Sequence, residues 1–298
     1  MGGAWTAGAA LVAETWHPAH RGKGGALMQI GLPLGSMLAI AVVSAVNAEM
    51  GGLDGQGWKI IYLMGFLPMV VIIPLGLRTP ESPIWLERRR LAVASERPSQ
   101  EAAVAVSRGY LSRLSCAFGF IFFAQYIYWG VFTWTPSFLV SAKHFAFVRS
   151  LEFTMTQQIG SLLGFLVFAS LVDRFGRRPA FLLYLAVGAG AVGWLVLGTT
   201  PMAIMAAMFL SGFGITGIFA GLGPLTAELA PPGAGRAFFM GLAYNGGRLG
   251  GILAPFLIGA LATTDANFIL GMATAIPAFL FAAIILFTIP ETKGLRLA

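Results

Sequence analysis

The sequence has few charged residues and almost no cysteine. Of its 298 residues only 10% are charged and one is a cysteine, whereas 57% are hydrophobic. A soluble domain usually carries about 25% charged residues, so water is not the main solvent of this chain. Cys116 has no second cysteine for an internal disulfide and is interpreted as a small apolar packing residue. The composition disfavours a soluble enzyme, a nucleic-acid-binding protein and a disulfide scaffold.

The motifs of metal and nucleotide chemistry are also missing. The three histidines, His17, His20 and His144, lie in loops or at their edges, and the first two have no acidic or cysteine partner at ligand spacing. There is no P-loop, and the glycine-rich stretch 188–193 lies inside an apolar run without the strand that precedes a dinucleotide site. We therefore expect no metal, no cofactor and no enzyme, and an ion gradient rather than a nucleotide as the energy source.

Long apolar runs dominate what is present. Most are about 20 residues long, which is the length of a helix that spans a bilayer, and they predict an all-α integral membrane fold with several spans. The first run rises only about 16 Å as a helix, so we expect the chain to start inside a longer span. Glycine pairs four residues apart, namely 31 with 35, 160 with 164 and 217 with 221, predict close helix packing. The nine runs are 3–13, 25–46, 60–77, 114–140, 153–172, 180–197, 202–222, 238–261 and 268–289.

The basic residues are distributed unevenly between the loops. If alternate loops share a side of the membrane, fifteen Lys and Arg residues lie on one side and three on the other, and Arg248 lies inside a run. The positive-inside rule places the richer side, which includes the carboxy terminus, in the cytoplasm. The net charge of +7 is then an orientation signal and not a nucleic-acid-binding surface, and the predicted location is the bacterial inner membrane.

Several features recur along the chain. In segments 13–22 and 227–237, an acid ends one apolar run and an arginine opens the next. The matched pairs are 210 to 215 residues apart, which predicts duplicated helical bundles of the kind that transporters contain. The first copy of the loop 173–178 would fall about 40 residues before Met1, so we expect a duplication that is cut at the front. The pairs are Glu14 with Glu228, Arg21 with Arg236, Gly31 with Gly246, Gly35 with Gly250, and Pro80 with Pro290.

These motifs resemble, in order, those of the major facilitator superfamily, and within it the sugar porters and the related organic-acid and proton symporters. Residues 173–178 (DRFGRR) resemble the loop between the second and third helices of a half, and segment 13–22 the loop after the fourth. Segments 80–86 and 290–294 resemble those that close the sixth and twelfth helices. In many members the first helix carries an acid for proton coupling, and it has no counterpart here. The resemblance implies a partial N-terminal bundle (helices four to six) in 1–77, a cytoplasmic interdomain loop in 78–113, and a six-helix C-terminal bundle (helices seven to twelve) in 114–298.

The charged loop residues are predicted to control conformation. Basic side chains at helix ends can bridge to carboxylates and to helix carboxy termini, and so hold one arrangement of two rocking bundles. Asp173 can accept hydrogen bonds from the amino end of the next helix. The alternative is that the arginines only set the topology of a solvated loop, but a charge bias alone does not require Asp173 and Gly176 at fixed places. The predicted gating residues are Asp173, Arg174, Gly176, Arg177, Arg178, Glu14, Arg21, Glu228 and Arg236.

Substrate contacts are expected from polar residues deep in the membrane. Arg248 lies 12 residues after Arg236, about 18 Å along a helix, where a charge is costly and needs a cavity or a partner. It either receives a carboxylate in the forked geometry of guanidinium or braces carbonyls freed by neighbouring glycines. A polar-aromatic stripe in run 114–140 either stacks a substrate ring or packs helices. The predicted substrate-binding residues are Arg248, Tyr244, Asn245, Gln125, Tyr126, Trp129 and Thr133.

The sequence thus predicts a secondary transporter that works by alternating access and imports a small organic acid, sugar acid or sugar together with protons. One alternative is a truncated or misannotated fragment of such a transporter, without transport activity of its own. Another is a membrane-embedded enzyme or sensor, but its paired buried acids, metal cluster or signalling domain are not found in the sequence. The expected partners are a small-molecule substrate, protons and the lipid bilayer, with no nucleic acid, and the oligomeric state is left open.

Overall fold

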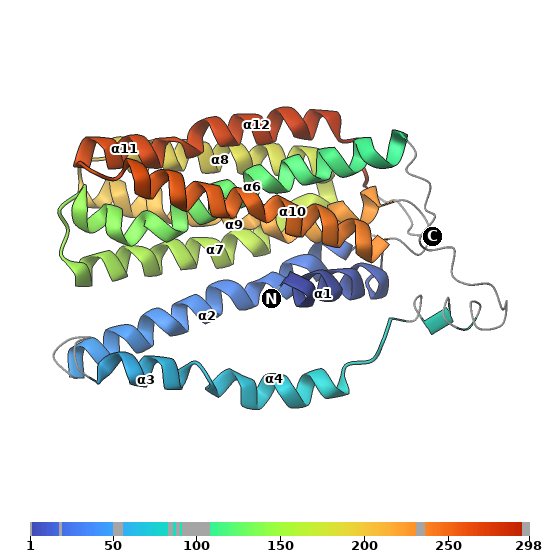
Figure 1. Cartoon of the computed structure of the whole chain (residues 1–298), viewed down its shortest axis with the longest axis horizontal. Helices are drawn as coiled ribbons and strands as arrows, with labels where there is room; N and C mark the ends of the chain where they lie inside the picture. Colours follow the sequence, from blue (N-terminus) through green and yellow to red (C-terminus); the bar gives the residue numbers. More distant parts are fainter. Residues whose placement is uncertain are drawn as a thin grey trace.

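The computed structural model describes residues 2–17, 20–49, 56–82, 86–87, 90, 108–230 and 236–293, and within them the chain forms helices and no strands. Each of the nine apolar runs becomes a helix or a pair of consecutive helices (Figure 1). Most of the predicted loop 78–113 lies outside the described residues. The helices are α1 (Gly2–Thr15), α2 (Arg21–Glu49), α3 (Gly57–Met64), α4 (Leu67–Arg78), α6 (Arg108–Ser141), α7 (Phe147–Phe175), α8 (Arg177–Leu197), α9 (Pro201–Leu229), α10 (Arg236–Leu261), α11 (Asp265–Ala273) and α12 (Ala275–Thr288).

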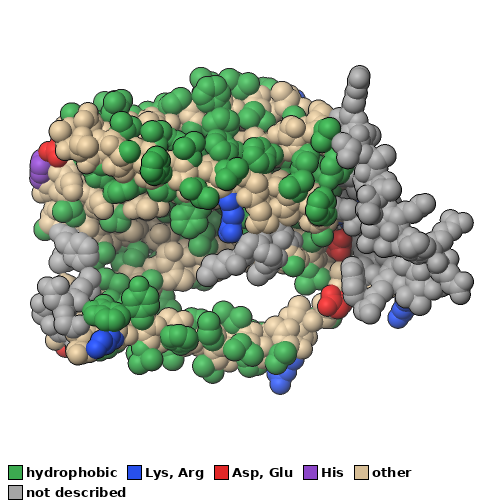
Figure 2. All heavy atoms as spheres, in the orientation of Figure 1, with side chains coloured by type: hydrophobic (Ala, Val, Ile, Leu, Met, Phe, Trp, Pro, Cys, Tyr) green, Lys and Arg blue, Asp and Glu red, His purple; other side chains and the backbone are tan. Residues whose placement is uncertain are grey.

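Among the described residues, seven stretches are long and apolar enough to cross a membrane when two pairs of consecutive helices are each counted once. They include α2, whose 29 residues rise about 43 Å, and the continuous pairs α3–α4 and α11–α12. Large apolar side chains cover the outside of the molecule, whereas charged side chains lie mostly at its two ends (Figure 2). Such a surface is stable in hydrocarbon and not in water. The chain is therefore an integral membrane protein with several spans.

Helices α6 to α12 form a bundle with its own core, called here the C-terminal bundle. Aromatic side chains fill that core: Phe120 and Phe168 pack edge-on against Phe181, and the Tyr184 hydroxyl donates to the Gly164 carbonyl at 2.9 Å. Gly160 and Gly164 lie against the backbone of α9 so closely that a side chain would not fit. Close packing of α7 with α9 is thus confirmed.

Helices α1 to α4, called here the N-terminal segment, lie along one side of this bundle. Helix α2 packs on α7 and α9, and α1 packs on α9 and α10 (Figure 1). The buried positions of α2 are concentrated between Arg21 and Pro33, with Val46 as the one further position. Gly31 and Gly35 have no described atom within 4 Å of an added Cβ, so the prediction of close packing is wrong for this pair among the described residues.

The two parts are in contact where α1 and α9 end and α2 and α10 begin. We call this the charged end, because Glu14, Arg21, Glu228 and Arg236 all lie there. Arg21 and Arg236 are 4% and 2% exposed, so both guanidinium groups are buried where the N-terminal segment meets the C-terminal bundle. Arg21, Glu228 and Arg236 are buried and Glu14 is partly buried, and buried charges at one interface require partners.

Candidate functional site

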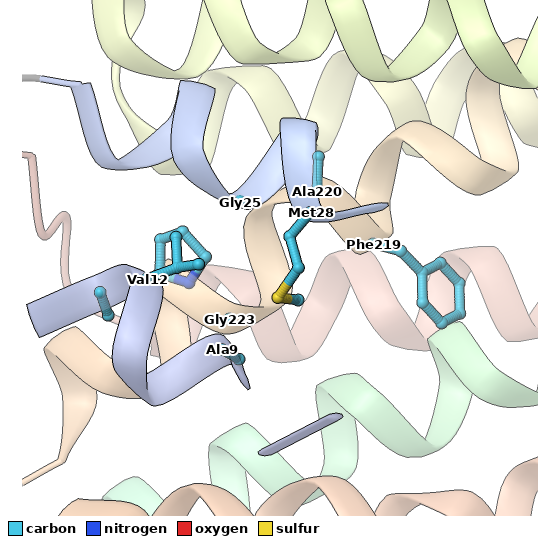
Figure 3. Close-up of a pocket in the computed structure, with 9 residues that line it drawn as sticks. Ala9, Val12, Gly25, Met28, Phe219, Ala220 and Gly223 are labelled. Atoms are coloured by element: carbon cyan, nitrogen blue, oxygen red, sulfur yellow. The ribbon is translucent and has the colours of Figure 1, made fainter. Parts of the chain in front are cut away.

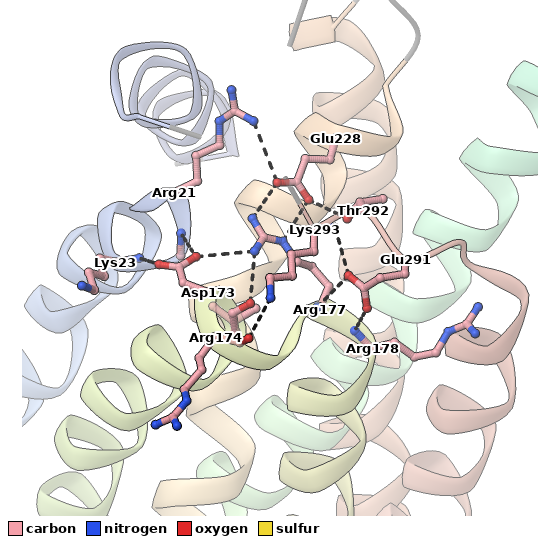
Figure 4. Close-up of polar contacts among 12 residues, drawn as sticks. Arg21, Lys23, Asp173, Arg174, Arg177, Arg178, Glu228, Glu291, Thr292 and Lys293 are labelled. Atoms are coloured by element: carbon pink, nitrogen blue, oxygen red, sulfur yellow. Dashed lines mark hydrogen bonds and ion pairs between the residues drawn. The ribbon is translucent and has the colours of Figure 1, made fainter. Parts of the chain in front are cut away.

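Glu228, in the last turn of α9, is the centre of a buried cluster at the charged end. Arg177, which opens α8, donates from Nε to Oε2 at 3.1 Å and from Nη2 to Oε1 at 2.7 Å, and the Thr292 hydroxyl donates to Oε2 at 2.6 Å (Figure 4). The Glu228 and Arg177 side chains are 0% and 3% exposed. The forked pair and the hydroxyl offset the cost of removing two charges from water.

Ion pairs at the charged end cross between the N-terminal segment and the C-terminal bundle. Glu14, near the end of α1, lies 3.3 Å from Nη1 of Arg236 in α10. Arg21 of α2 lies 4.0 Å from Glu228 of α9, and its Nε donates to the Ala13 carbonyl at 3.0 Å. Each acid of the two matching loops therefore faces the arginine of the other loop.

Two carboxylates cap helix amino termini at the charged end. Asp173 was expected to cap the next helix, and this is wrong: it accepts from the backbone N–H groups of Gly22 at 3.1 Å and Lys23 at 3.3 Å, in α2. The next helix, α8, is capped by Glu291, which accepts from the N–H groups of Arg177 at 2.9 Å and Arg178 at 3.0 Å. Sequence reasoning missed this because a helix can be capped by a carboxylate from any neighbouring element.

Gly176, between α7 and α8, is required for the second cap. Its φ is 106°, a backbone conformation that residues other than glycine rarely adopt. A Cβ at this position would lie 2.9 Å from Oε2 of Glu291. Glycine at this position lets the chain turn between the two helices. It also lets the Glu291 carboxylate reach the first N–H groups of α8.

The pKa of Glu291 reflects this capping. Burial alone would raise it, but hydrogen bonds from the backbone N–H groups of Arg177, Arg178, Lys293 and Thr292 outweigh burial and lower the pKa below its ordinary value of 4.5. Glu291 is therefore held as a carboxylate at neutral pH, the state in which it can accept these bonds.

Arg178 and Arg174 are placed differently. Arg178 donates from Nη2 to the carbonyls of Phe287, at 3.2 Å, and Ile289 at the end of α12, where a cation is favoured by the helix dipole. The Arg174 side chain is exposed, over the Phe175 ring, and points away from the cluster (Figure 4). Only its backbone carbonyl joins the group, as acceptor for Lys293 Nζ at 2.7 Å.

The duplication seen in the sequence has a counterpart in the contacts. Ser82, after α4, donates its hydroxyl to Glu14, as Thr292, after α12, does to Glu228. These hydroxyls occupy matching places in the repeated segments 80–83 and 290–293. Both acids are thus held by a hydroxyl of their own repeat and lie near an arginine of the other one.

A second group lies deeper in the molecule, around Tyr244 of α10. The indole of Trp5, in α1, stacks on the Tyr244 ring with centroids 3.5 Å apart and planes 14° apart, and its Nε1 donates to Oε1 of Gln29 at 3.1 Å. The Arg248 guanidinium lies 5.6 Å from the centre of the Tyr244 ring, within the range of a cation–π contact. The two parts of the chain therefore meet through aromatic and amide groups.

Helix α6 contributes further predicted residues to this region. Gln125 is buried, lies beside Tyr244 and accepts from Trp129 Nε1 at 2.8 Å. We call Trp5, Gln29, Gln125, Trp129, Tyr244 and Arg248 the central aromatic group. The sequence analysis missed Trp5 and Gln29, although a glutamine inside an apolar run was a usable signal.

The remaining predicted substrate residues lie at the margin of this group. The Tyr126 hydroxyl donates to Thr274 Oγ1 at 2.9 Å, where α11 gives way to α12. Thr133 is exposed. The Asn245 amide donates to the Gly241 carbonyl of its own helix at 3.0 Å. The structure thus brings four of the seven predicted residues together, namely Gln125, Trp129, Tyr244 and Arg248.

A small pocket between α1, α2 and α9 lies closer to the charged end (Figure 3). Its lining is apolar, and the Met28 side chain extends into it from α2 (Figure 3). There is room for little more than a single water molecule. The pocket offers no side-chain hydrogen bond to a polar ligand, so the central aromatic group is the better candidate site. The lining residues are Ala9, Val12, Ala13, Gly25, Met28, Phe219, Ala220, Gly223 and Pro224.

The fold and these motifs define a class of protein. The family model of the Major Facilitator Superfamily matches residues 1–155 and again residues 150–297. The chain therefore belongs to the major facilitator superfamily.

Relatives and solved structures agree. A probable 4-methylmuconolactone transporter of Cupriavidus pinatubonensis is 31% identical over 310 residues, covering 100% of this chain and 68% of the relative. A niacin transporter of Acinetobacter baylyi is 30% identical, covering 87% and 63%. The proton:xylose symporter XylE, bound to 6-bromo-6-deoxy-D-glucose, has the same fold, with a TM-score of 0.76, 19% identity, and coverage of 97% of this chain and 68% of that one. All three are named as transporters and none as an enzyme.

Proposed function

We propose that the protein is a secondary active transporter that moves a small organic acid across the membrane by alternating access, in symport with protons. Arg248 is the observation that favours an acid as the substrate. It lies midway along α10 among aromatic and amide side chains of both parts of the chain, and a guanidinium favours a carboxylate over a neutral ligand. Niacin, in the name of one relative, is an aromatic carboxylic acid.

The residues of the charged end are proposed to act as gates. The pairs Glu14–Arg236 and Arg21–Glu228 join the two parts of the chain, so they hold only the arrangement in which this end is closed. Asp173 adds to that lock because it caps α2 from α7. Gly176, Arg177 and Arg178 shape and brace the C-terminal side of the lock. Arg174 contributes through its backbone and its charge.

The arrangement in the membrane follows from the basic residues. We place the charged end and the carboxy terminus in the cytoplasm of a bacterial inner membrane, because Lys and Arg concentrate on that side. Residues 1–77 and 114–298 are the two moving bodies, and 78–113 link them. In this proposed orientation the ion pairs of the charged end close the cytoplasmic side, and the substrate would reach Arg248 from the other side.

Uptake into proteoliposomes tests the proposal. With an inward proton gradient, we expect accumulation of radiolabelled niacin that a protonophore abolishes. Unlabelled benzoate should compete, whereas nicotinamide, which has the same ring but no carboxylate, and xylose should compete poorly. Arg248→Gln should raise the KM for niacin about tenfold or more, the loss expected for a hydrogen bond to a charged group. Arg149→Gln is the matched control, since that arginine is 53% exposed.

Two results would contradict the proposal in different ways. Uptake that prefers xylose, or that is unchanged in Arg248→Gln, would contradict the acid assignment and leave transport standing. A protein that inserts and folds but takes up none of the probes would contradict transport. It would favour the alternative of a chain without transport activity of its own.

A further inference from the structure

Trp5 of α1 makes an aromatic contact across the interface between the two parts of the chain. Among the described residues, its stack on Tyr244 is the aromatic pair that joins the N-terminal segment to the C-terminal bundle. The indole is also fixed in direction, because Nε1 donates to Gln29 of α2 at 3.1 Å. The ring is thus held by α1, oriented by α2 and covered by α10.

The stack lies between Arg248 and the charged end. Tyr244 follows Arg236 by eight residues and precedes Arg248 by four, which places it about 12 Å above the start of α10 and about 6 Å short of Arg248. Trp5 precedes Glu14 by nine residues, about 14 Å along α1. The two rings meet at the same depth.

A dry layer separates the stack from the ion pairs. Ala9, Ala10 and Ala13 of α1 pack on Ala227 and Met240, and Trp5 packs against this cluster. These five side chains are each at most 8% exposed. A ligand at Arg248 would therefore meet the Trp5–Tyr244 stack, then an apolar layer, then the ion pairs, before it reached the charged end.

We propose that Trp5 is the inner gate of the transporter. Its stack on Tyr244 closes the floor of the Arg248 site in the state seen here, and the two rings must separate for a ligand to pass toward the charged end. The separation is possible because the rings belong to different moving bodies. Gln29 is the positioning residue that keeps the indole in the closed orientation. This inference rests on the proposed function, which supplies the two bodies and their relative motion.

Cysteine accessibility tests the gate without any substrate. In a Cys116→Ser background, Arg248→Cys places the only thiol on the far side of the stack from the charged end. Labelling by a membrane-impermeant thiol reagent is followed in inside-out and in right-side-out vesicles. We expect slow labelling from the side of the charged end and faster labelling from the other side. Adding Trp5→Ala should speed labelling from the charged-end side about three- to tenfold, the equilibrium shift expected for loss of one stacked pair.

Three further variants separate a gate from general loosening. Trp5→Phe keeps an aromatic ring, so its labelling rate should be close to that of the protein with Trp5. Trp5→Leu fills space without stacking, so its labelling rate should resemble that of Trp5→Ala. Trp194→Ala, at an exposed tryptophan of α8, should change nothing. The inference is overturned if Trp5→Ala and Trp5→Leu label at the original rate from both sides, or if Trp194→Ala speeds labelling equally. Because niacin uptake is not measured, failure of the acid assignment would not affect this result.

Discussion

The carboxylate of Glu14 lies 3.3 Å from the guanidinium of Arg236, although the two residues are 222 positions apart in the sequence. The matching acid, Glu228, lies near the matching arginine, Arg21, at 4.0 Å. In each pair, the acid of one repeated loop thus lies beside the arginine of the other. The pairs Glu14–Arg236 and Arg21–Glu228 form only while the two parts are together, although Glu228 also pairs with Arg177 inside its own bundle. These two pairs make the charged end a reporter of conformation.

This pairing can be tested by reversing one pair. Glu14 and Arg236 are 13% and 3% exposed, so we expect Glu14→Arg or Arg236→Glu alone to destabilise the protein by about 3–5 kcal/mol, as for a broken buried pair. The double variant should recover part of that loss, as read from thermal unfolding midpoints in detergent. The same reversal of Arg149 and Glu152, which are 53% and 61% exposed, should cost less than about 1 kcal/mol at any step. A double variant no more stable than the worse single one would show that the pair is not coupled.

Glu228→Gln should be severe although it changes no volume. The substitution removes the nearer charged partner of Arg177, which is 3% exposed, and leaves only Asp173 at 3.5 Å, so we expect a loss of about 3–5 kcal/mol in unfolding free energy. Thr292→Val removes only the hydroxyl that donates to Glu228 and should cost about 1–3 kcal/mol. Equal effects of the two variants in the same denaturation assay would mean that the ion pair contributes little.

Gly176→Ala should destabilise the turn between α7 and α8. The residue has a φ of 106°, and the added Cβ would lie 2.9 Å from the Glu291 carboxylate, so we expect a cost of about 1–3 kcal/mol. Gly190→Ala, in the middle of α8, meets no atom of the described residues within 4 Å and should stabilise the helix by about 0.5–1 kcal/mol. Opposite shifts of the two unfolding midpoints are the expected result, and a stabilising Gly176→Ala would contradict the role of this glycine.

Glu291 should make stability depend on acid pH. Its pKa in the folded protein is lowered, because backbone hydrogen bonds from Arg177, Arg178 and Lys293 to the carboxylate outweigh burial. The stabilisation is fully present above the ordinary value of 4.5 and is lost as the pH falls through the lower folded pKa. We expect the unfolding midpoint of the unmodified protein to fall more steeply than that of Glu291→Gln below this value. Parallel pH profiles of the two proteins would contradict the capping role.

Much of the helical architecture follows from hydropathy, and the breaks within it have a local cause. The runs 60–77 and 268–289 were expected as single helices, but each forms two, α3–α4 and α11–α12. Pro68 and Pro277 lie near the start of the second piece in each case. A proline has no N–H to donate and crowds the preceding turn, which favours a break at these places. Proline alone does not predict the breaks, because other helices continue through an internal proline, namely Pro33, Pro74, Pro136, Pro224 and Pro255.

The partners of the polar residues could not be predicted in the same way. An arginine in the middle of an apolar run, such as Arg248, is visible in a sequence because it is costly there, and Tyr244 follows from helical spacing. Trp5 lies in another helix, and nothing local to it indicates the stack on Tyr244. The cap of α2 by Asp173 was missed for the same reason, since a helix dipole does not specify which element supplies its counter-charge.

Asp173 caps the amino terminus of α2, a helix outside its own bundle, and this limits which parts of homologous chains can be combined. The N–H groups that open α2 donate to a carboxylate of α7, while the arginine that opens α10 pairs with a carboxylate of α1. Neither part of the chain carries a complete set of counter-charges. A chimaera that joined one part of this chain to the corresponding part of a distant homologue would fold stably only if the homologue had the same acids and arginines at these positions. We therefore expect an exchange of one part between homologues to preserve the fold only when these acids and arginines stay together.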